Sequence, residues 1–175
     1  MRLKSTILLL FALYYVSSAV GQTERLSPPA HTECKFPDGK TVIIDYSSPR
    51  MKGRKIFGDL VPFGQVWRTG ANEATTFETT TNIVMEGKLV PAGKYTIFTI
   101  PKPDKWTLII DKKTGEWGIP YKYEADELTR ADLIVVPTKS SVENFTIAFD
   151  QRRGGCVLRI SWENTEASGL VAESK

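Results

Sequence analysis

The stretch QVWRTGANEATT, residues 65–76, brings together three side chains that could do chemistry. Arg68 offers a planar fork of hydrogen-bond donors suited to a carboxylate, a phosphate or a sugar hydroxyl. Asn72 carries both a donor and an acceptor, and it tolerates the turn that Gly70 introduces. Glu73 stands at the mouth of the following predicted strand. Arg68, Asn72 and Glu73 are therefore candidate ligand-binding residues.

A basic run, RMKGRK, precedes this stretch in the same long connection. The run favours recognition of an anionic group beside Arg68, or it forms a solvated face of the loop. Asp45 and Tyr46, which end a predicted strand, are candidates for one wall of such a site. The cationic residues of the run are Arg50, Lys52, Arg54 and Lys55. The ligand that this set would bind is small and polar or anionic.

A purely structural interpretation of the same residues stays open. A long irregular loop must find partners for its backbone amides and carbonyls, and polar side chains supply them. In that interpretation Arg68 and Glu73 pair with each other, Trp67 caps the core, and Asn72 bonds loop backbone. We expect strong energetic coupling between Arg68 and Glu73, with one edge of the guanidinium left free.

An enzymatic alternative is a hydrolase of carbohydrate or cell-envelope material that uses Glu73 as its acid or base. Such an enzyme needs a second carboxylate about 5 to 10 Å away across a cleft, and Asp45 is only a nominal partner. His31 is the sole histidine, which removes the usual acid–base and zinc arrangements. Outside this alternative, the sequence predicts no catalytic residue, no metal site and no cofactor.

The first residues predict export. Arg2 and Lys4 precede an apolar run and a small-residue cleavage site, the pattern of a secretory signal peptide over residues 1–21. Cleavage before Gln22 would lower the formal net charge from +3 to +1, since Arg2 and Lys4 leave with no acid. A near-neutral chain gives no reason to expect nucleic acid or an anionic membrane as the main partner. No later stretch is apolar enough to span a bilayer.

Two cysteines remain, Cys34 and Cys156. Period-2 alternation places Cys34 on the same strand face as Phe36, and Cys156 on the same face as Leu158, so both thiols point toward the core. An exported chain lives where disulfides persist, and an even count favours pairing. We expect a structural disulfide; buried free thiols and a redox pair are the alternatives.

The elements that must position these residues read as strands. Residues 22–30 form a short tether, and residues 31–172 form one domain, a single antiparallel β-sandwich or flattened barrel. The 47–72 connection lacks alternation but is too apolar to stay solvated, so it should be ordered and packed on the sandwich. Residues 121–130 are compatible with one helical turn. Strands are predicted over 31–36, 41–46, 74–81, 82–86, 88–90, 94–100, 106–111, 131–138, 142–149, 156–163 and 168–171.

Several runs resemble one family. DYSSPRMKGRKIFGDLVPFGQVWRTGANEATT, VPAGKYTIFTIP, WTLIIDKKTGEWG and VENFTIAF are similar to DUF2911, a bacterial domain of unknown function. The resemblance extends from about Ser27 to Ala172. It implies an exported bacterial protein with a β-rich domain, and it implies no reaction, substrate or cofactor. We expect a periplasmic or secreted protein that acts as a binding or structural module, with its ligand or partner unidentified.

Overall fold

The computed structural model describes residues 25–174. The predicted signal peptide and its cleavage site lie outside the described residues. Of the predicted tether, the structure describes the part from Arg25 onward.

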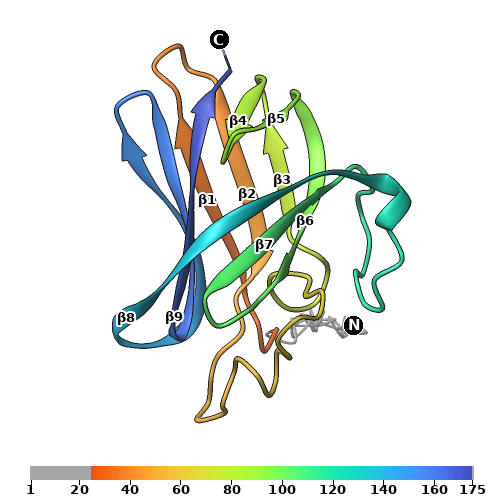
Figure 1. The fold of residues 1–175 in the computed structure, drawn as a ribbon, viewed down its shortest axis with the longest axis vertical. Helices are drawn as coiled ribbons and strands as arrows, with labels where there is room; N and C mark the ends of the chain where they lie inside the picture. Colours follow the sequence, from red (N-terminus) through yellow and green to blue (C-terminus); the bar gives the residue numbers. More distant parts are fainter. Residues whose placement is uncertain (1–24, 175) are drawn as a thin grey trace, which may run out of the picture.

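The described residues form nine strands in one antiparallel sheet (Figure 1). The order across the sheet is β1-β2-β3-β6-β7-β8-β9-β4-β5. The strands are β1 (Pro29–Lys35), β2 (Thr41–Ser47), β3 (Thr76–Thr79), β4 (Ile83–Met85), β5 (Lys88–Val90), β6 (Gly93–Ile100), β7 (Lys105–Asp111), β8 (Glu127–Arg152) and β9 (Gly155–Glu173). A 3₁₀ turn, η1 (Glu124–Asp126), leads into β8, in the segment predicted to hold one helical turn.

Side-chain alternation explains most of these strands. In β2, Val42 and Ile44 are fully buried while Asp45 is exposed, as a sheet with one solvated face requires. β6 is different, because Tyr95 to Thr99 are all buried. Its outer face is covered by Tyr121 and Tyr123, which pack against Phe98.

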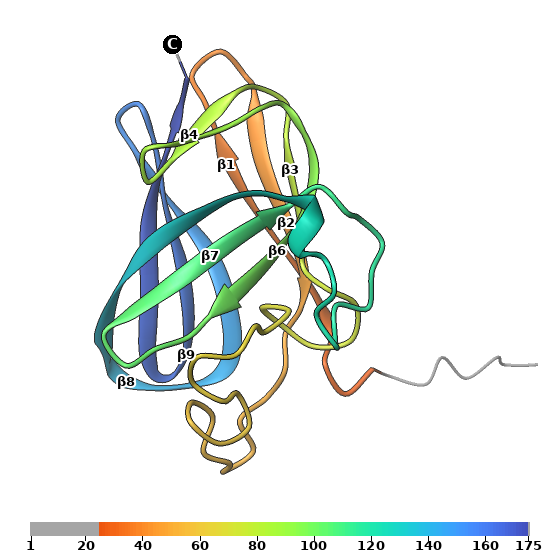
Figure 2. The ribbon, with the colours of Figure 1, turned by 45° about the vertical axis from the view of Figure 1, so that its right-hand side comes forward.

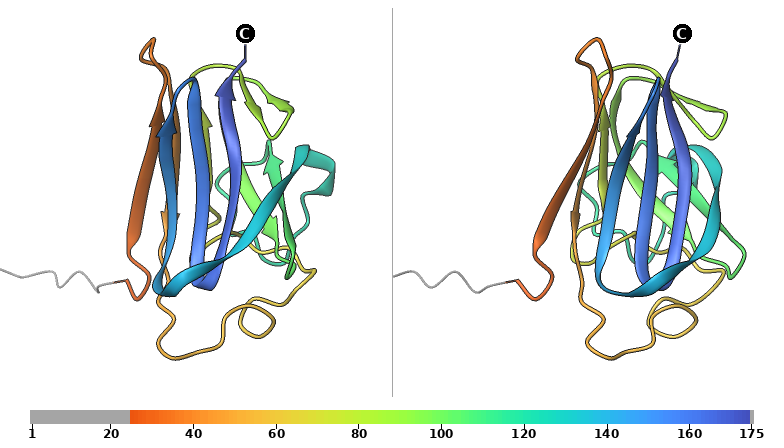
Figure 3. Two further views of the ribbon diagram at one scale, coloured as in Figure 1. Left: turned by 60° about the vertical axis from the view of Figure 1, so that its left-hand side comes forward. Right: turned by 90° about the vertical axis from the view of Figure 1, so that its left-hand side faces the viewer.

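The sheet folds over on itself because β8 and β9 are long and curved (Figures 2 and 3). The first part of β8 pairs with β7 and the rest pairs with β9, with register shifts after Pro137 and Val142. The fold brings β1 to the far part of the sheet, where the Cys34–Cys156 disulfide joins β1 to β9. The predicted disulfide is therefore confirmed.

The predicted all-β antiparallel sandwich is also confirmed, in a particular form. Two layers are built from one continuous sheet, and β1 forms a β-ladder with β2 alone among the described strands, so the sheet does not close into a barrel. Between the layers lies a core that contains Phe77, Ile97, Leu108, Leu158 and Trp162.

Some predicted boundaries are wrong. The strands predicted at 131–138 and 142–149 are one strand, β8, and those predicted at 156–163 and 168–171 are one strand, β9. The polar residues 139–141 separate the two predicted strands, yet the chain stays extended there and absorbs the irregularity as bulges. The strand predicted at 74–81 shortens to β3. In residues 25–174, no helix is both long and apolar enough to cross a membrane.

Candidate ligand-binding site

The connection between β2 and β3 is ordered and fastened at both sides, as expected. On one side, Phe145 donates its amide to Pro49 O at 2.9 Å and Met51 donates to Glu143 O at 2.8 Å. On the other side, Trp67 exchanges two backbone hydrogen bonds with Thr99 of β6, at 2.8 and 2.9 Å. Tertiary bonds thus replace the ladder that this irregular backbone lacks.

Apolar side chains of the connection also enter the core. Ile56, Phe57 and Val61 are buried. Trp67 stacks on Trp162 with ring centroids 6.0 Å apart and planes 17° apart, and its indole NH donates to Gly70 O at 3.1 Å. The predicted capping role of Trp67 is therefore what the structure shows.

The Gly-Ala-Asn turn needs unusual backbone angles. Thr69, Gly70 and Asn72 have φ of 53°, 158° and 57°, a region that non-glycine residues rarely occupy. A Cβ at Gly70 would lie 3.0 Å from Ser47 O, so the position needs glycine for close approach as well. Thr75 ties the turn by donating its hydroxyl to Thr69 O at 2.7 Å. The turn sets the direction in which Arg68 leaves the chain.

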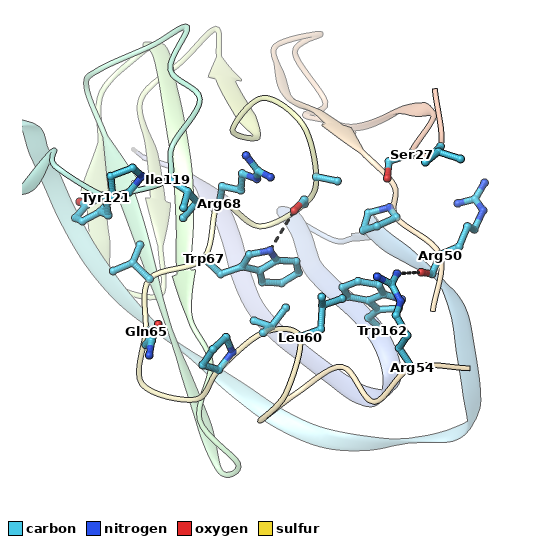
Figure 4. A pocket seen from close by; sticks show the side chains of 18 of the residues that line it. Ser27, Arg50, Arg54, Leu60, Gln65, Trp67, Arg68, Ile119, Tyr121 and Trp162 are labelled. Atoms are coloured by element: carbon cyan, nitrogen blue, oxygen red, sulfur yellow. Dashed lines mark hydrogen bonds between the residues drawn. The ribbon is translucent and has the colours of Figure 1, made fainter. Parts of the chain in front are cut away.

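A cavity of about 1030 Å³ opens beside this turn (Figure 4). Its walls come from four parts of the chain: the 49–71 connection, the 119–124 loop, the tether at Leu26 and Ser27, and Trp162 of β9. Much of the lining is apolar and aromatic, as in most small-molecule sites. The apolar and aromatic lining residues include Leu26, Leu60, Val61, Val66, Trp67, Ile119, Tyr121 and Trp162.

Four cationic side chains line the same cavity, against one carboxylate, Glu124. Two of the cations are held by oxygens of their own loop. Arg50 Nη1 donates to Ser48 O at 3.0 Å and to Ser48 Oγ at 2.9 Å. Arg54 donates to Met51 O at 3.0 Å and to Arg50 O at 2.6 Å. The four cations are Arg50, Lys52, Arg54 and Arg68.

These four charges have no acidic partner among residues 25–174, where the ion pairs of the structure involve other cations. Neutral carbonyl and hydroxyl oxygens orient the guanidinium groups without neutralising them. A cationic lining with unneutralised charge attracts an anion.

Arg68 lies half-buried against the 112–120 loop. Its Nη1 donates to Trp117 O at 3.3 Å, and its guanidinium carbon lies 4.9 Å from the centre of the Trp117 ring, a cation–π geometry. Gly118 (φ 87°) lies directly beneath, because a Cβ there would be 3.1 Å from Arg68 Cβ. Burial lowers the pKa of Arg68, and the charge of Glu73 partly offsets that shift.

The expected ion pair between Arg68 and Glu73 is not formed. Glu73 bonds Arg25 of the tether instead, Nη1 to Oε2 at 3.1 Å, and both side chains are more than half exposed. Hydrogen bonding to its own amide, and then to Arg25, holds the pKa of Glu73 below its usual range. The sequence-based pairing failed because nothing in the pattern indicated that the tether would return to this turn.

Asn72 also serves the tether. Its amide donates to Ser27 O at 3.2 Å and to Ser47 Oγ at 3.1 Å, so its polar atoms are used in holding two backbone segments together. Neither Asn72 nor Glu73 lines the cavity.

The predicted wall of Asp45 and Tyr46 is wrong as well. Asp45 accepts from His31 Nδ1 at 2.7 Å on the exposed face of β1 and β2. Tyr46 packs edge-on against Phe145 and donates to Ile147 O at 3.2 Å. Neither residue lines the cavity. Strand alternation points these neighbouring side chains to opposite faces of the sheet, Asp45 toward solvent and Tyr46 toward the core.

The wall of the cavity that faces the 49–71 connection was not predicted from the sequence. Ile119, Pro120, Tyr121 and Glu124 come from a polar segment without periodicity. Tyr121 donates to Glu127 at 2.6 Å, and burial and that carboxylate raise the pKa of Tyr121. Within residues 25–174, His, Cys, Asp and Glu form no group of three suited to a metal ion.

A family model described as "Protein of unknown function (DUF2911)" matches residues 27–170. No curated protein and no solved structure matches the chain. The matched span contains both the four cations and the 119–124 loop, so the whole cavity except Leu26 lies inside it.

Proposed function

Since this chain belongs to the DUF2911 family, whose description assigns no activity, we propose a function from its own geometry. The protein is an exported, non-catalytic binding domain. Its ligand is a small molecule with an apolar body and an anionic group, such as a carboxylate or a phosphate. The ligand occupies the cavity between the 49–71 connection and the 119–124 loop.

One observation carries this proposal: Arg50, Lys52, Arg54 and Arg68 face one cavity without an acidic partner among the described residues. Leaving cations unneutralised beside apolar surface is unfavourable unless water or an anion compensates them. An anionic ligand group would meet the guanidinium edges that the loop oxygens leave free.

The size and lining of the cavity define the rest of the ligand. About 1030 Å³ is at the upper end of small-molecule sites. Trp67, Leu60 and Ile119 offer contacts to an aliphatic chain or an aromatic ring. A bare inorganic anion would leave those contacts unused, so an amphipathic anion fits better.

The export part of the proposal rests on two features. Residues 1–21 have the composition of a signal peptide. The Cys34–Cys156 bond joins residues 122 positions apart in sequence, and structural disulfides of this kind persist in oxidising compartments such as the periplasm or the extracellular space.

A titration tests the binding function. Decanoate is added to the purified protein and tryptophan fluorescence is followed, because Trp67 lines the cavity. Decan-1-ol, which has the same chain length and no charge, is the control ligand. We expect saturable binding of decanoate, and binding weakened about tenfold or more in Arg50→Gln and Arg68→Gln, since each removes a charged hydrogen bond. Arg153→Gln, an exposed cation away from the cavity, should bind as wild type.

Equal binding of decanoate and decan-1-ol, or unchanged affinity in both cavity variants, would refute the proposal. The hydrolase alternative is checked on the same protein. It requires turnover of a glycoside that disappears in Glu73→Gln, whereas a binding domain turns over none.

A further inference from the structure

The end of the molecule that holds the cavity also exposes bulky apolar side chains. Leu60, Phe63, Trp117 and Ile119 are 43 to 56% exposed, and Leu26 is 83% exposed. Leu26, Leu60 and Ile119 line the cavity, Phe63 lies between lining residues Pro62 and Gln65, and Trp117 stacks under Arg68. We refer to Leu26, Leu60, Phe63, Trp117 and Ile119 as the apolar rim.

A rigid turn presents the most prominent part of this rim. Gly58 donates its amide to Val61 O and Val61 donates to Ile56 O, both at 2.9 Å. Ile56 and Val61 are buried, which roots the turn in the core. The ring of Phe63 packs on Gly58, where a Cβ would lie 2.8 Å from Phe63 Cε2. The fold therefore holds Leu60 and Phe63 in solvent on an anchored support.

Positive charge is concentrated on the same segment. Residues 49–68 carry five cations, Arg50, Lys52, Arg54, Lys55 and Arg68, and one acid, Asp59. Over the remainder of residues 25–174, acidic side chains outnumber cationic ones. The near-zero net charge of the described residues therefore conceals an uneven distribution along the sequence, because the cationic excess lies in residues 49–68, within the long loop at one end of the sandwich (Figure 2).

We propose that this loop end docks on an anionic lipid bilayer, with the apolar rim inserted at the headgroup level and the basic run facing the lipid phosphates. Exposed aromatic and aliphatic side chains ringed by Lys and Arg are the composition that binds such interfaces. Trp117 beside Arg68 suits the same boundary, since its ring is apolar and its edge is polar.

An anionic bilayer would contact both the apolar rim and the cations beside it. A sulfated polysaccharide or another polyanion would use the cations and leave Phe63 and Leu60 in water. A neutral apolar partner would use the rim and leave five cations unmatched. The orientation also points the cavity mouth at the membrane, because Leu26, Leu60 and Ile119 belong to both rim and cavity.

The docking proposal goes beyond the binding function and is tested on residues outside the cavity lining, Lys55 and Phe63. Co-sedimentation is measured with vesicles of phosphatidylcholine, with and without phosphatidylglycerol. Wild-type protein should bind the anionic vesicles and lose binding at high salt. Lys55→Gln/Phe63→Ser should lower the partition coefficient at least about tenfold, since one cation alone contributes roughly fivefold at an anionic surface.

The matched control is Lys88→Gln/Leu89→Ser, which removes a cation and an exposed leucine from β5, at the opposite end of the molecule (Figure 1). It should bind vesicles as wild type does. Lys55→Gln alone, which leaves the Phe63 turn intact, should show an intermediate loss.

Three results would overturn the proposal: no binding to anionic vesicles, equal binding to neutral ones, or equal binding by the double variant and wild type. Heparin is the further probe. If heparin binds wild type and Phe63→Ser adds nothing to Lys55→Gln with vesicles, the surface recognises polyanions and not bilayers. Decanoate binding in Lys55→Gln/Phe63→Ser shows separately whether the cavity still works.

Discussion

At the residue scale, the partners of Arg68 and Glu73 decide what the GANEAT turn is for. Arg68 leans on Trp117 and faces the cavity, while Glu73 reaches away to Arg25. Arg68 and Glu73 share no hydrogen bond or ion pair in residues 25–174, and the charge of each is only a lesser cause of the other's pKa shift. The charge of Arg68 is therefore available to a ligand.

This arrangement predicts that Arg68→Ala and Glu73→Ala act almost independently. Neither change strands a buried opposite charge, so the double variant should lose stability equal to the sum of the single losses within about 0.5 kcal/mol. Thermal or urea unfolding of the two single variants and the double variant measures the three stability losses that are compared. A coupling of several kcal/mol would instead indicate a direct, buried pair.

Asp111 provides a second residue-scale prediction. It is fully buried, it accepts from the Lys113 amide at 2.8 Å and lies 3.4 Å from the Tyr121 hydroxyl oxygen, and burial raises its pKa. A carboxyl whose pKa is higher in the folded state destabilises the fold at pH values above that pKa. The penalty disappears as the pH falls toward the unfolded value.

Asp111→Asn should therefore raise the melting temperature at pH 7 and give a smaller gain near pH 4. The amide oxygen still accepts from Lys113, and the new NH₂ can donate to the Tyr121 oxygen, whose proton goes to Glu127. Thermal melts of wild type and of Asp111→Asn at both pH values measure the difference in melting temperature. A loss of stability at pH 7 would mean that the Asp111 charge stabilises the fold.

The residue scale also shows what sequence can predict of a site. Arg50, Lys52, Arg54 and Arg68, which are predicted from their charge, line the cavity, whereas Lys55 of the same basic run does not. Asn72, predicted from its donor and acceptor, and Glu73, predicted from its place before the next strand, bond the tether instead. Their roles depend on Arg25 and Ser27, some 45 residues away in sequence, and no local pattern encodes that contact.

At the element scale, the tether is a structural part of the site. Ser48 donates its amide to Pro28 O at 2.9 Å, Asn72 bonds Ser27, and Leu26 and Ser27 line the cavity. The start of β1 is thus connected to the loop end of the sheet. Local opening here would remove one wall of the cavity.

Asn72→Ala should loosen the tether without unfolding the sandwich. We expect a loss of about 1 kcal/mol from the two hydrogen bonds and faster hydrogen exchange at the Ser48 amide. Exchange in β6 and β7 should stay unchanged, which serves as the internal control. Uniformly faster exchange across the sheet would show that Asn72 supports the whole fold.

Elements were predictable where alternation is strong and unpredictable where it breaks. In β2 and in the buried part of β9, every second side chain is buried. The predicted bounds of both strands lie within a few residues of the observed ones. The single long strand β8 is predicted as two, because the polar residues 139–141 interrupt the alternation. The bend there is imposed by pairing with both β7 and β9, a tertiary constraint.

At the scale of the whole molecule, the disulfide holds the folded-over sheet together. Cys34 and Cys156 lie in β1 and β9, which do not pair with each other in the sheet. Replacing both cysteines by serine should lower the free energy of unfolding by roughly 4 kcal/mol, from the loop entropy of so long a closed segment. Urea unfolding of oxidised and reduced wild type checks the value. Equal midpoints would mean that the bond adds nothing to stability.

The central claim is that an amphipathic anion binds among the four cations of the cavity. NMR of labelled protein during a decanoate titration tests it most directly, by following the indole NH of Trp67 and the Nε–H of each arginine. The account predicts that Trp67, Arg50 and Arg68 shift together with one dissociation constant, while Arg130 and Arg159, held in ion pairs elsewhere, do not move. Shifts confined to other surfaces, or none at saturating decanoate, would contradict it.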